Sequence, residues 1–81
     1  MGDYMWNLDE NLKNEPLYVR IYLQLKKMIS EGKYVEHQKM PSKRKLAQTL
    51  KVSPLTVDQA YQQLIAEGYV YSIEKSGFYV K

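Results

Sequence analysis

Residues 39–68 constrain the fold of this 81-residue chain more than any other stretch. A basic segment at residues 39–47 leads into a short apolar helical pattern that ends near Leu50, and a second helical pattern follows residues 51–53. Two short helices joined by three or four residues form a helix-turn-helix, whose second helix enters the major groove of DNA. Because the basic charge lies at the shared edge of these helices, double-stranded DNA is the first partner that the sequence suggests.

Both helices of this pair begin with a recognisable signal. Ser42 can cap the first helix with its hydroxyl, and Ser53 followed by Pro54 repeats the signal for a helix over about residues 54–67. Gly68 ends that helix. The apolar residues recur at helical spacing: Leu46, Ala47 and Leu50, then Val57, Ala60, Tyr61, Leu64 and Ile65.

A further helix and a hairpin flank this unit. Pro16, in the first turn, and Gly32 bound a helix with an apolar stripe at Leu17, Ile21, Leu25, Met28 and Ile29. Residues 69–73 alternate with a period of two, and a turn at residues 74–77 returns the chain through residues 78–80, so that residues 69–80 form a hairpin. The order predicts an α+β winged helix-turn-helix over residues 16–81, with residues 1–15 a partly mobile extension whose Trp6 either docks on the domain or waits for another neighbour.

Charge and composition narrow the class of protein. The net charge is +3, but residues 39–81 hold seven Lys and Arg against three Asp and Glu, whereas residues 1–38 hold five against six. There is no cysteine, which excludes disulfides and thiolate zinc sites. No apolar run approaches the roughly 20 residues that span a bilayer, and the N-terminus does not resemble a signal peptide. We expect one small domain in a cytoplasmic protein with no membrane partner.

The sequence offers little for catalysis. It has one histidine, His37, in an expected loop, and it has no glycine-rich phosphate loop and no carboxylate pair at a spacing typical of acid-base chemistry. We therefore predict that this chain is not an enzyme and that it holds no cofactor and no metal.

The candidate DNA-binding residues lie at the starts of two helices and at the hairpin tip. Basic residues in the first turn of a helix interact unfavourably with the helix dipole. We therefore expect the basic residues at positions 43–45 to bind phosphate, unless they form only a solvated face. The polar residues of the later helix can bind phosphate or base edges, and Leu55, if exposed, can contact a thymine methyl. A carboxylate at Asp58 is repelled by phosphate, but it can accept a hydrogen bond from a cytosine amino group or from a nearby lysine. The candidates are Lys43, Arg44, Lys45, Ser53, Leu55, Thr56, Gln59, Gln63, Lys75 and Ser76.

Residues 40–47, 52–57 and 60–69 together resemble the N-terminal DNA-binding domain of the GntR family of bacterial transcription regulators, and the resemblance extends over about residues 16–80. It implies sequence-specific binding of double-stranded operator DNA, and a homodimer in the full-length regulator. It also implies that Arg44 contacts phosphate or base and that Gly77 is the wing-tip glycine, which joins the candidates. Proline at position 54 replaces a common arginine, and Lys75 replaces a glycine; without that arginine we expect an AT-rich site.

Ala60, Tyr61 and Leu64, with residues 67–69 and the early Met5 and Trp6, most resemble the MocR subfamily. Its members have a C-terminal aminotransferase-like domain that binds pyridoxal phosphate, senses an effector and dimerises. The chain ends one residue after the expected wing, so we expect such a domain in a longer protein. Pro54 instead resembles the YtrA-like subfamily, whose C-terminal part is short and helical. The alternative function is a winged helix that binds protein without reading DNA.

Overall fold

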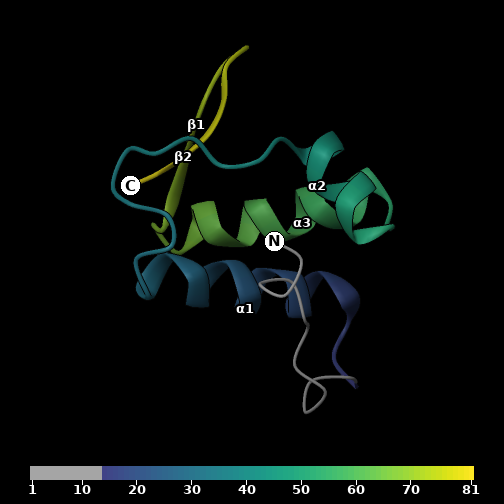
Figure 1. The fold of residues 1–81 in the computed structure, drawn as a ribbon. Coiled ribbons are helices and arrows are strands. Elements are labelled where there is room, and N and C mark those ends of the chain that lie inside the picture. Colours follow the sequence, from purple (N-terminus) through teal and green to yellow (C-terminus); the bar gives the residue numbers. More distant parts are fainter. Residues whose placement is uncertain (1–13) are drawn as a thin grey trace.

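The computed structural model describes residues 14–81, which form three helices and a two-stranded antiparallel hairpin (Figure 1). The helices are α1 (Leu17–Ser30), α2 (Lys43–Leu50) and α3 (Pro54–Ala66), and the strands are β1 (Val70–Ile73) and β2 (Gly77–Val80). The winged helix-turn-helix predicted from the sequence is therefore confirmed.

The two predicted serine caps are present. The hydroxyl of Ser42 accepts a hydrogen bond from the amide of Lys45 at 3.1 Å, and that of Ser53 accepts one from the amide of Thr56 at 3.2 Å. Each bond satisfies an amide that the first turn of a helix leaves unpaired. Pro54 occupies the first turn of α3, as predicted, whereas Pro16 lies one residue before α1 and acts there through its carbonyl, which accepts from the amides of Val19 and Arg20.

The turn between α2 and α3 contains a residue in the left-handed conformation. Lys51 has φ 59° and ψ 46°, and its amide bonds to carbonyls of the last turn of α2. Glycine is the usual residue at such a helix end because a Cβ atom disfavours positive φ. The turn at the end of α2 therefore places a modest strain on Lys51, and no feature of the sequence had indicated this conformation.

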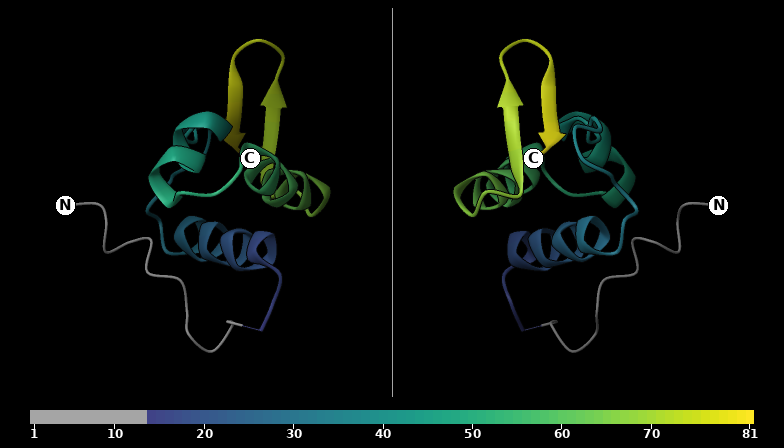
Figure 2. Two further views of the ribbon diagram at one scale, coloured as in Figure 1. Left: turned by 90° about the vertical axis from the view of Figure 1, so that its right-hand side faces the viewer. Right: turned by 90° about the vertical axis from the view of Figure 1, so that its left-hand side faces the viewer.

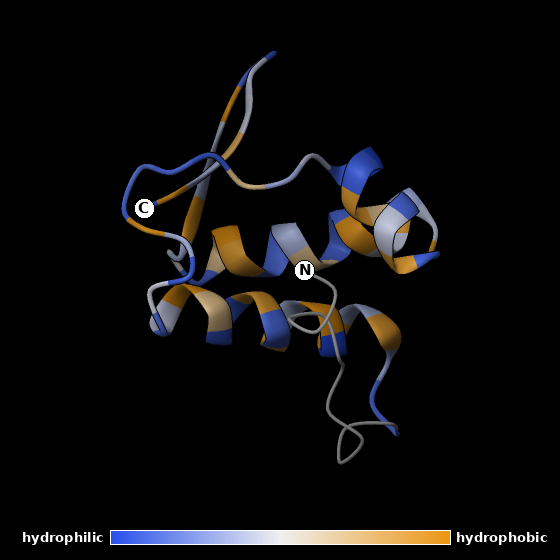
Figure 3. Cartoon of the chain, viewed as in Figure 1, coloured by the Kyte–Doolittle hydropathy of each residue, from blue (hydrophilic) through white to orange (hydrophobic). Residues whose placement is uncertain are grey.

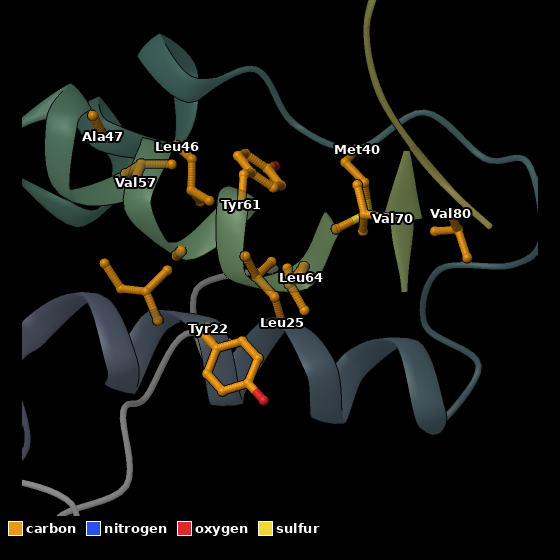
Figure 4. Close-up of a cluster of buried hydrophobic side chains, with 12 residues drawn as sticks. Tyr22, Leu25, Met40, Leu46, Ala47, Val57, Tyr61, Leu64, Val70 and Val80 are labelled. Atoms are coloured by element: carbon orange, nitrogen blue, oxygen red, sulfur yellow. The ribbon is translucent and has the colours of Figure 1, made fainter. Parts of the chain in front are cut away.

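The three helices pack around a single core. In two orientations α1 lies on one side of α3, while the hairpin projects from the opposite side (Figures 1 and 2). Apolar residues recur along both helices (Figure 3), and the side chains of Leu25 in α1 and Leu64 in α3 lie close together between them (Figure 4). The core cluster consists of Ile21, Tyr22, Leu25, Met40, Leu46, Ala47, Val57, Ala60, Tyr61, Leu64, Val70 and Val80.

Tyr61 connects three parts of this core. Its side chain is fully buried, its hydroxyl donates a hydrogen bond to the carbonyl of Pro41, and its ring stacks on Phe78 with centroids 4.3 Å apart. Burial raises the pKa of the Tyr61 phenol far above its usual value, so the hydroxyl remains a donor. One side chain of α3 thus holds both the segment before α2 and strand β2.

The loop before α2 adds a short backbone pairing to the hairpin that the sequence did not reveal. The amide of His37 donates to the carbonyl of Val80 at 2.8 Å, and the amide of Met40 donates to that of Phe78 at 2.7 Å. Lys39 forms an isolated bridge with Tyr79. Because only backbone groups make this pairing, the side-chain pattern of residues 37–40 did not predict it.

Further predictions concern the N-terminal extension, membrane-spanning helices and metal sites. Trp6 and most of the expected N-terminal extension lie outside residues 14–81. Within the described residues, no helix is long and apolar enough to cross a membrane, and no group of three or more His, Cys, Asp or Glu is placed to hold a metal ion.

Replacing Tyr61 with phenylalanine tests the hydrogen bond to Pro41. Tyr61→Phe keeps the stacked ring but leaves a partly buried carbonyl without its donor, so we expect the free energy of unfolding to fall by about 1 to 2 kcal/mol. Urea denaturation followed by circular dichroism measures this loss. Tyr71→Phe, which removes a hydroxyl whose hydrogen bond to His37 is exposed to solvent, is the control and should cost clearly less; equal losses would contradict the role assigned to the Tyr61 hydroxyl.

Candidate nucleic-acid interface

The side of α3 that faces away from the core has an exposed stripe, formed by Leu55, Gln59, Gln62 and Ala66. Their spacing of three to four residues places them on one helical face. Leu55, near the start of the helix, is 67% exposed, which meets the condition under which the sequence analysis assigned it an apolar contact. Figure 1 shows α1 lying along one side of α3, and the four stripe residues are exposed, so α1 does not cover them.

The N-terminal end of α3 presents two linked hydroxyls. The oxygens of Ser53 and Thr56 lie 2.8 Å apart, and either hydroxyl can donate to the other. Whichever hydroxyl accepts in this bond keeps its own proton for an outside acceptor. The end of the helix also provides the partial positive charge that favours an anion. Ser53 and Thr56 are therefore brought together at a position suited to phosphate.

The basic residues at the start of α2 differ in their partners. The ammonium of Lys43 forms an ion pair with the carboxylate of Asp58 in α3, with an N–O distance of 3.1 Å. This contact matches the nearby-lysine alternative for Asp58. Arg44 and Lys45 are exposed, and within residues 14–81 neither forms an ion pair. These two side chains have the cationic groups of the cluster that remain available to phosphate.

The tip of the hairpin contains two residues with positive φ. Lys75 has φ 65°, in the region where glycine is favoured, and this explains why a glycine at that position would suit the turn. Gly77 has φ 142°, a conformation that side chains rarely adopt. The hydroxyl of Ser76 is bonded to that of Tyr79.

Lys39 is a cation that sequence reasoning did not select. A Cβ atom added at Gly77 would lie 3.1 Å from the Cε atom of Lys39. The end of the lysine side chain therefore lies beside the first residue of β2. Its only signal in the sequence was its place at the start of the basic segment. The backbone bridge between Lys39 and Tyr79 is what brings it to the hairpin.

Gln63 has a partner within the fold, on the side of α3 that faces α1. Its amide donates to Glu67 at 2.8 Å, and the other carboxylate oxygen of Glu67 accepts from the Tyr22 hydroxyl at 2.5 Å. The Tyr22 and Gln63 hydrogen bonds lower the pKa of Glu67, and the bond to Glu67 raises the pKa of Tyr22. Gln63 thus has a hydrogen-bond partner at the C-terminal end of α3. That it also contacts DNA stays a prediction.

His37 also has a structural role. Its Nδ1 atom lies 3.0 Å from the Tyr71 hydroxyl, and its backbone amide bonds to Val80. These contacts attach the loop before α2 to the base of the hairpin.

The sequence and the fold were compared with those of known proteins. Residues 17–80 match the family described as "Bacterial regulatory proteins, gntR family". A 64-residue alignment with the uncharacterized HTH-type transcriptional regulator YdeL of Bacillus subtilis (strain 168) is 44% identical; it covers 79% of this chain but only 14% of that relative.

The fold is shared with solved structures that include YtrA from Sulfolobus acidocaldarius and AraR(DBD). YtrA from Sulfolobus acidocaldarius, a GntR-family transcription factor, aligns with a TM-score of 0.83 and 35% identity, over 95% of this chain and 80% of that one. AraR(DBD), crystallised in complex with operator ORR3, aligns with a TM-score of 0.79 and 30% identity, over 82% of this chain and 80% of that one. With the family match over residues 17–80, these similarities show that the chain belongs to the GntR family of bacterial regulatory proteins.

Proposed function

We propose that this chain binds double-stranded operator DNA sequence-specifically, as the DNA-binding part of a bacterial GntR-type transcription regulator. The observation that supports this most is the exposed stripe of α3, a helix that is joined to the basic start of α2 by the ion pair between Asp58 and Lys43. A helix in this setting fits the major groove, where its side chains reach base edges. The complex of AraR(DBD) with an operator supports the same partner.

The proposed contacts divide into two classes. Arg44 and Lys45 bind phosphates beside the major groove, and the Ser53 and Thr56 hydroxyls bind phosphate at the start of α3. Leu55 and Gln59 read bases, the leucine against thymine methyl groups and the glutamine on an adenine edge. The hairpin tip, with Lys75, Ser76 and Gly77, lies beside the major groove and contacts the DNA backbone.

We propose that the full-length regulator is a homodimer. Two copies of α3 would then enter successive major grooves, roughly 34 to 36 Å apart along the duplex. A single domain lacks the tether that raises the effective concentration of the second module, so it should bind more weakly than the dimer.

For the part of the full-length regulator outside this domain, we propose one of two architectures. The aligned residues make up 14% of YdeL, a proportion that leaves room for the large pyridoxal phosphate-binding domain of a MocR-like protein. The similarity to YtrA from Sulfolobus acidocaldarius favours the YtrA-like plan, with a short helical C-terminal part. Because the relatives are transcription regulators, we propose a regulatory role in the bacterial cytoplasm in either case.

A binding-site selection from a random duplex library at low salt tests the proposed function. We expect a short AT-rich half-site to be enriched, because proline at position 54 removes the usual guanine-seeking arginine. Titration of the best duplex against a scrambled one should show tighter binding to the first. Equal binding to both would contradict sequence readout and favour a protein-binding winged helix, whereas a GC-rich site would contradict the role given to Pro54.

Arg44→Ala should weaken binding to every duplex alike, by about tenfold or ~1.4 kcal/mol at low salt. The plot of log affinity against log salt should also become shallower by about one unit, since one phosphate contact is lost. Fluorescence anisotropy titrations at several salt concentrations measure both quantities. Lys27→Ala in α1 removes the same charge from an exposed site on the other side of α3 and should change neither.

Gln59→Ala should change base preference. Loss of its bond to an adenine edge should reduce discrimination at one position of the half-site by about 1 to 3 kcal/mol and leave the other positions unaffected. Selections repeated with the variant measure this change. Gln63→Ala tests the other candidate glutamine, and we expect a smaller change because its amide is bonded to Glu67. An altered preference in the Gln63 variant would show that this glutamine does reach DNA.

A further inference from the structure

We propose that Asp58 sets the DNA affinity of this domain by neutralising Lys43 within the interface itself. This inference rests on the proposed function. The carboxylate lies on α3 one turn beyond the start of the helix, and it holds the ammonium of the first residue of α2. It thereby withdraws one cation from phosphate and lowers the affinity for every duplex, whatever its sequence.

The geometry places this ion pair where three elements meet. The Asp58 oxygen and the Lys43 nitrogen are 3.1 Å apart, and the same nitrogen lies 5.9 Å from the centroid of the Phe78 ring in β2. The side chain of Asp58 is 29% exposed and that of Lys43 is 45% exposed, so both groups remain partly accessible to solvent. A duplex that contacts α3, the start of α2 and the hairpin would therefore approach both charges.

The electrostatic consequence follows from the position of the carboxylate. If Lys43 stays bonded to Asp58, its charge is already compensated and attracts phosphate weakly. If Lys43 turns to a phosphate instead, the carboxylate of Asp58 is left without its partner close to a strongly negative duplex. Charges within about 10 Å interact appreciably at about 0.1 M salt, so either arrangement weakens binding. Arg44 and Lys45 form no such pair within residues 14–81.

Asp58→Asn tests the inference because it keeps the shape of the side chain and removes its charge. The 81-residue chain is titrated by fluorescence anisotropy against two labelled duplexes of about 20 base pairs, the best selected site and its scramble. We expect both to bind about three- to tenfold more tightly at low salt, with a salt dependence steeper by about 0.9 as Lys43 engages one more phosphate. Asp58→Ala should give the same gain.

Glu31→Gln is the matched control. It makes the same change in charge at the exposed C-terminal cap of α1, an element that holds none of the candidate DNA-binding residues, and should leave both affinities unchanged. An equal gain in this variant would overturn the inference, since net charge alone would then explain the effect. Thermal melting of each variant confirms that the compared proteins are folded.

A double-mutant cycle identifies Lys43 as the group through which Asp58 acts. Lys43→Met should weaken binding in the wild-type chain, because it leaves the Asp58 carboxylate without its partner beside the duplex. The loss should be larger in the Asp58→Asn background, where Lys43 binds a phosphate and its removal should also make the salt dependence shallower by about 0.9. Equal effects of Lys43→Met in both backgrounds would overturn the coupling. A loss of affinity at one cytosine position only, in Asp58→Asn, would overturn the inference and assign Asp58 to base reading.

Failure of this inference is distinguishable from failure of the proposed function. A wild-type chain that binds neither duplex at low salt contradicts the proposed function, and the inference with it. A wild-type chain that prefers the selected site, with an Asp58→Asn variant that binds no more tightly, overturns the inference alone.

Discussion

The burial of Tyr61 determines how the elements of the proposed interface lie relative to one another. Its ring stacks on Phe78 of the hairpin, and its hydroxyl bonds to Pro41 just before α2. Both contacts come from one residue of α3, so the helix, the basic start of α2 and the hairpin are held together from the inside. A partner that touches all three needs this arrangement before it arrives, because binding that must first order the protein is weakened by the lost conformational entropy.

The other face of α3 is occupied by contacts that maintain the fold. Glu67 accepts hydrogen bonds from Tyr22 and Gln63, and the ammonium of Lys26 lies 3.8 Å from the same carboxylate. These side chains join the end of α3 to α1. The two faces of α3 thus have separate roles, one in packing and one available for recognition, and a polar residue belongs to one or the other according to its position around the helix.

Local signals in the sequence predicted most of the elements. Ser42 and Ser53 act as caps through bonds to amides three residues later, and such contacts depend only on neighbours in the chain. The start of α3 at Pro54 and the hairpin at the C-terminus followed for the same reason. Contacts between distant residues were not predictable in this way. The pairing of residues 37–40 with β2 uses backbone groups alone, and the bond from Tyr22 to Glu67 joins residues that lie 45 positions apart in the chain.

By itself, the sequence determined the fold class, the helix starts, the basic segment and the residues that make up the candidate interface, because spacing, caps and charge are properties of neighbouring residues. The tertiary structure decided which of those residues are available. It paired Lys43 with Asp58, bonded Glu67 to Tyr22 of α1 and brought Lys39 beside Gly77. These outcomes depend on distances between groups that lie far apart in the chain or on different faces of a helix, and only packing of the whole domain sets such distances.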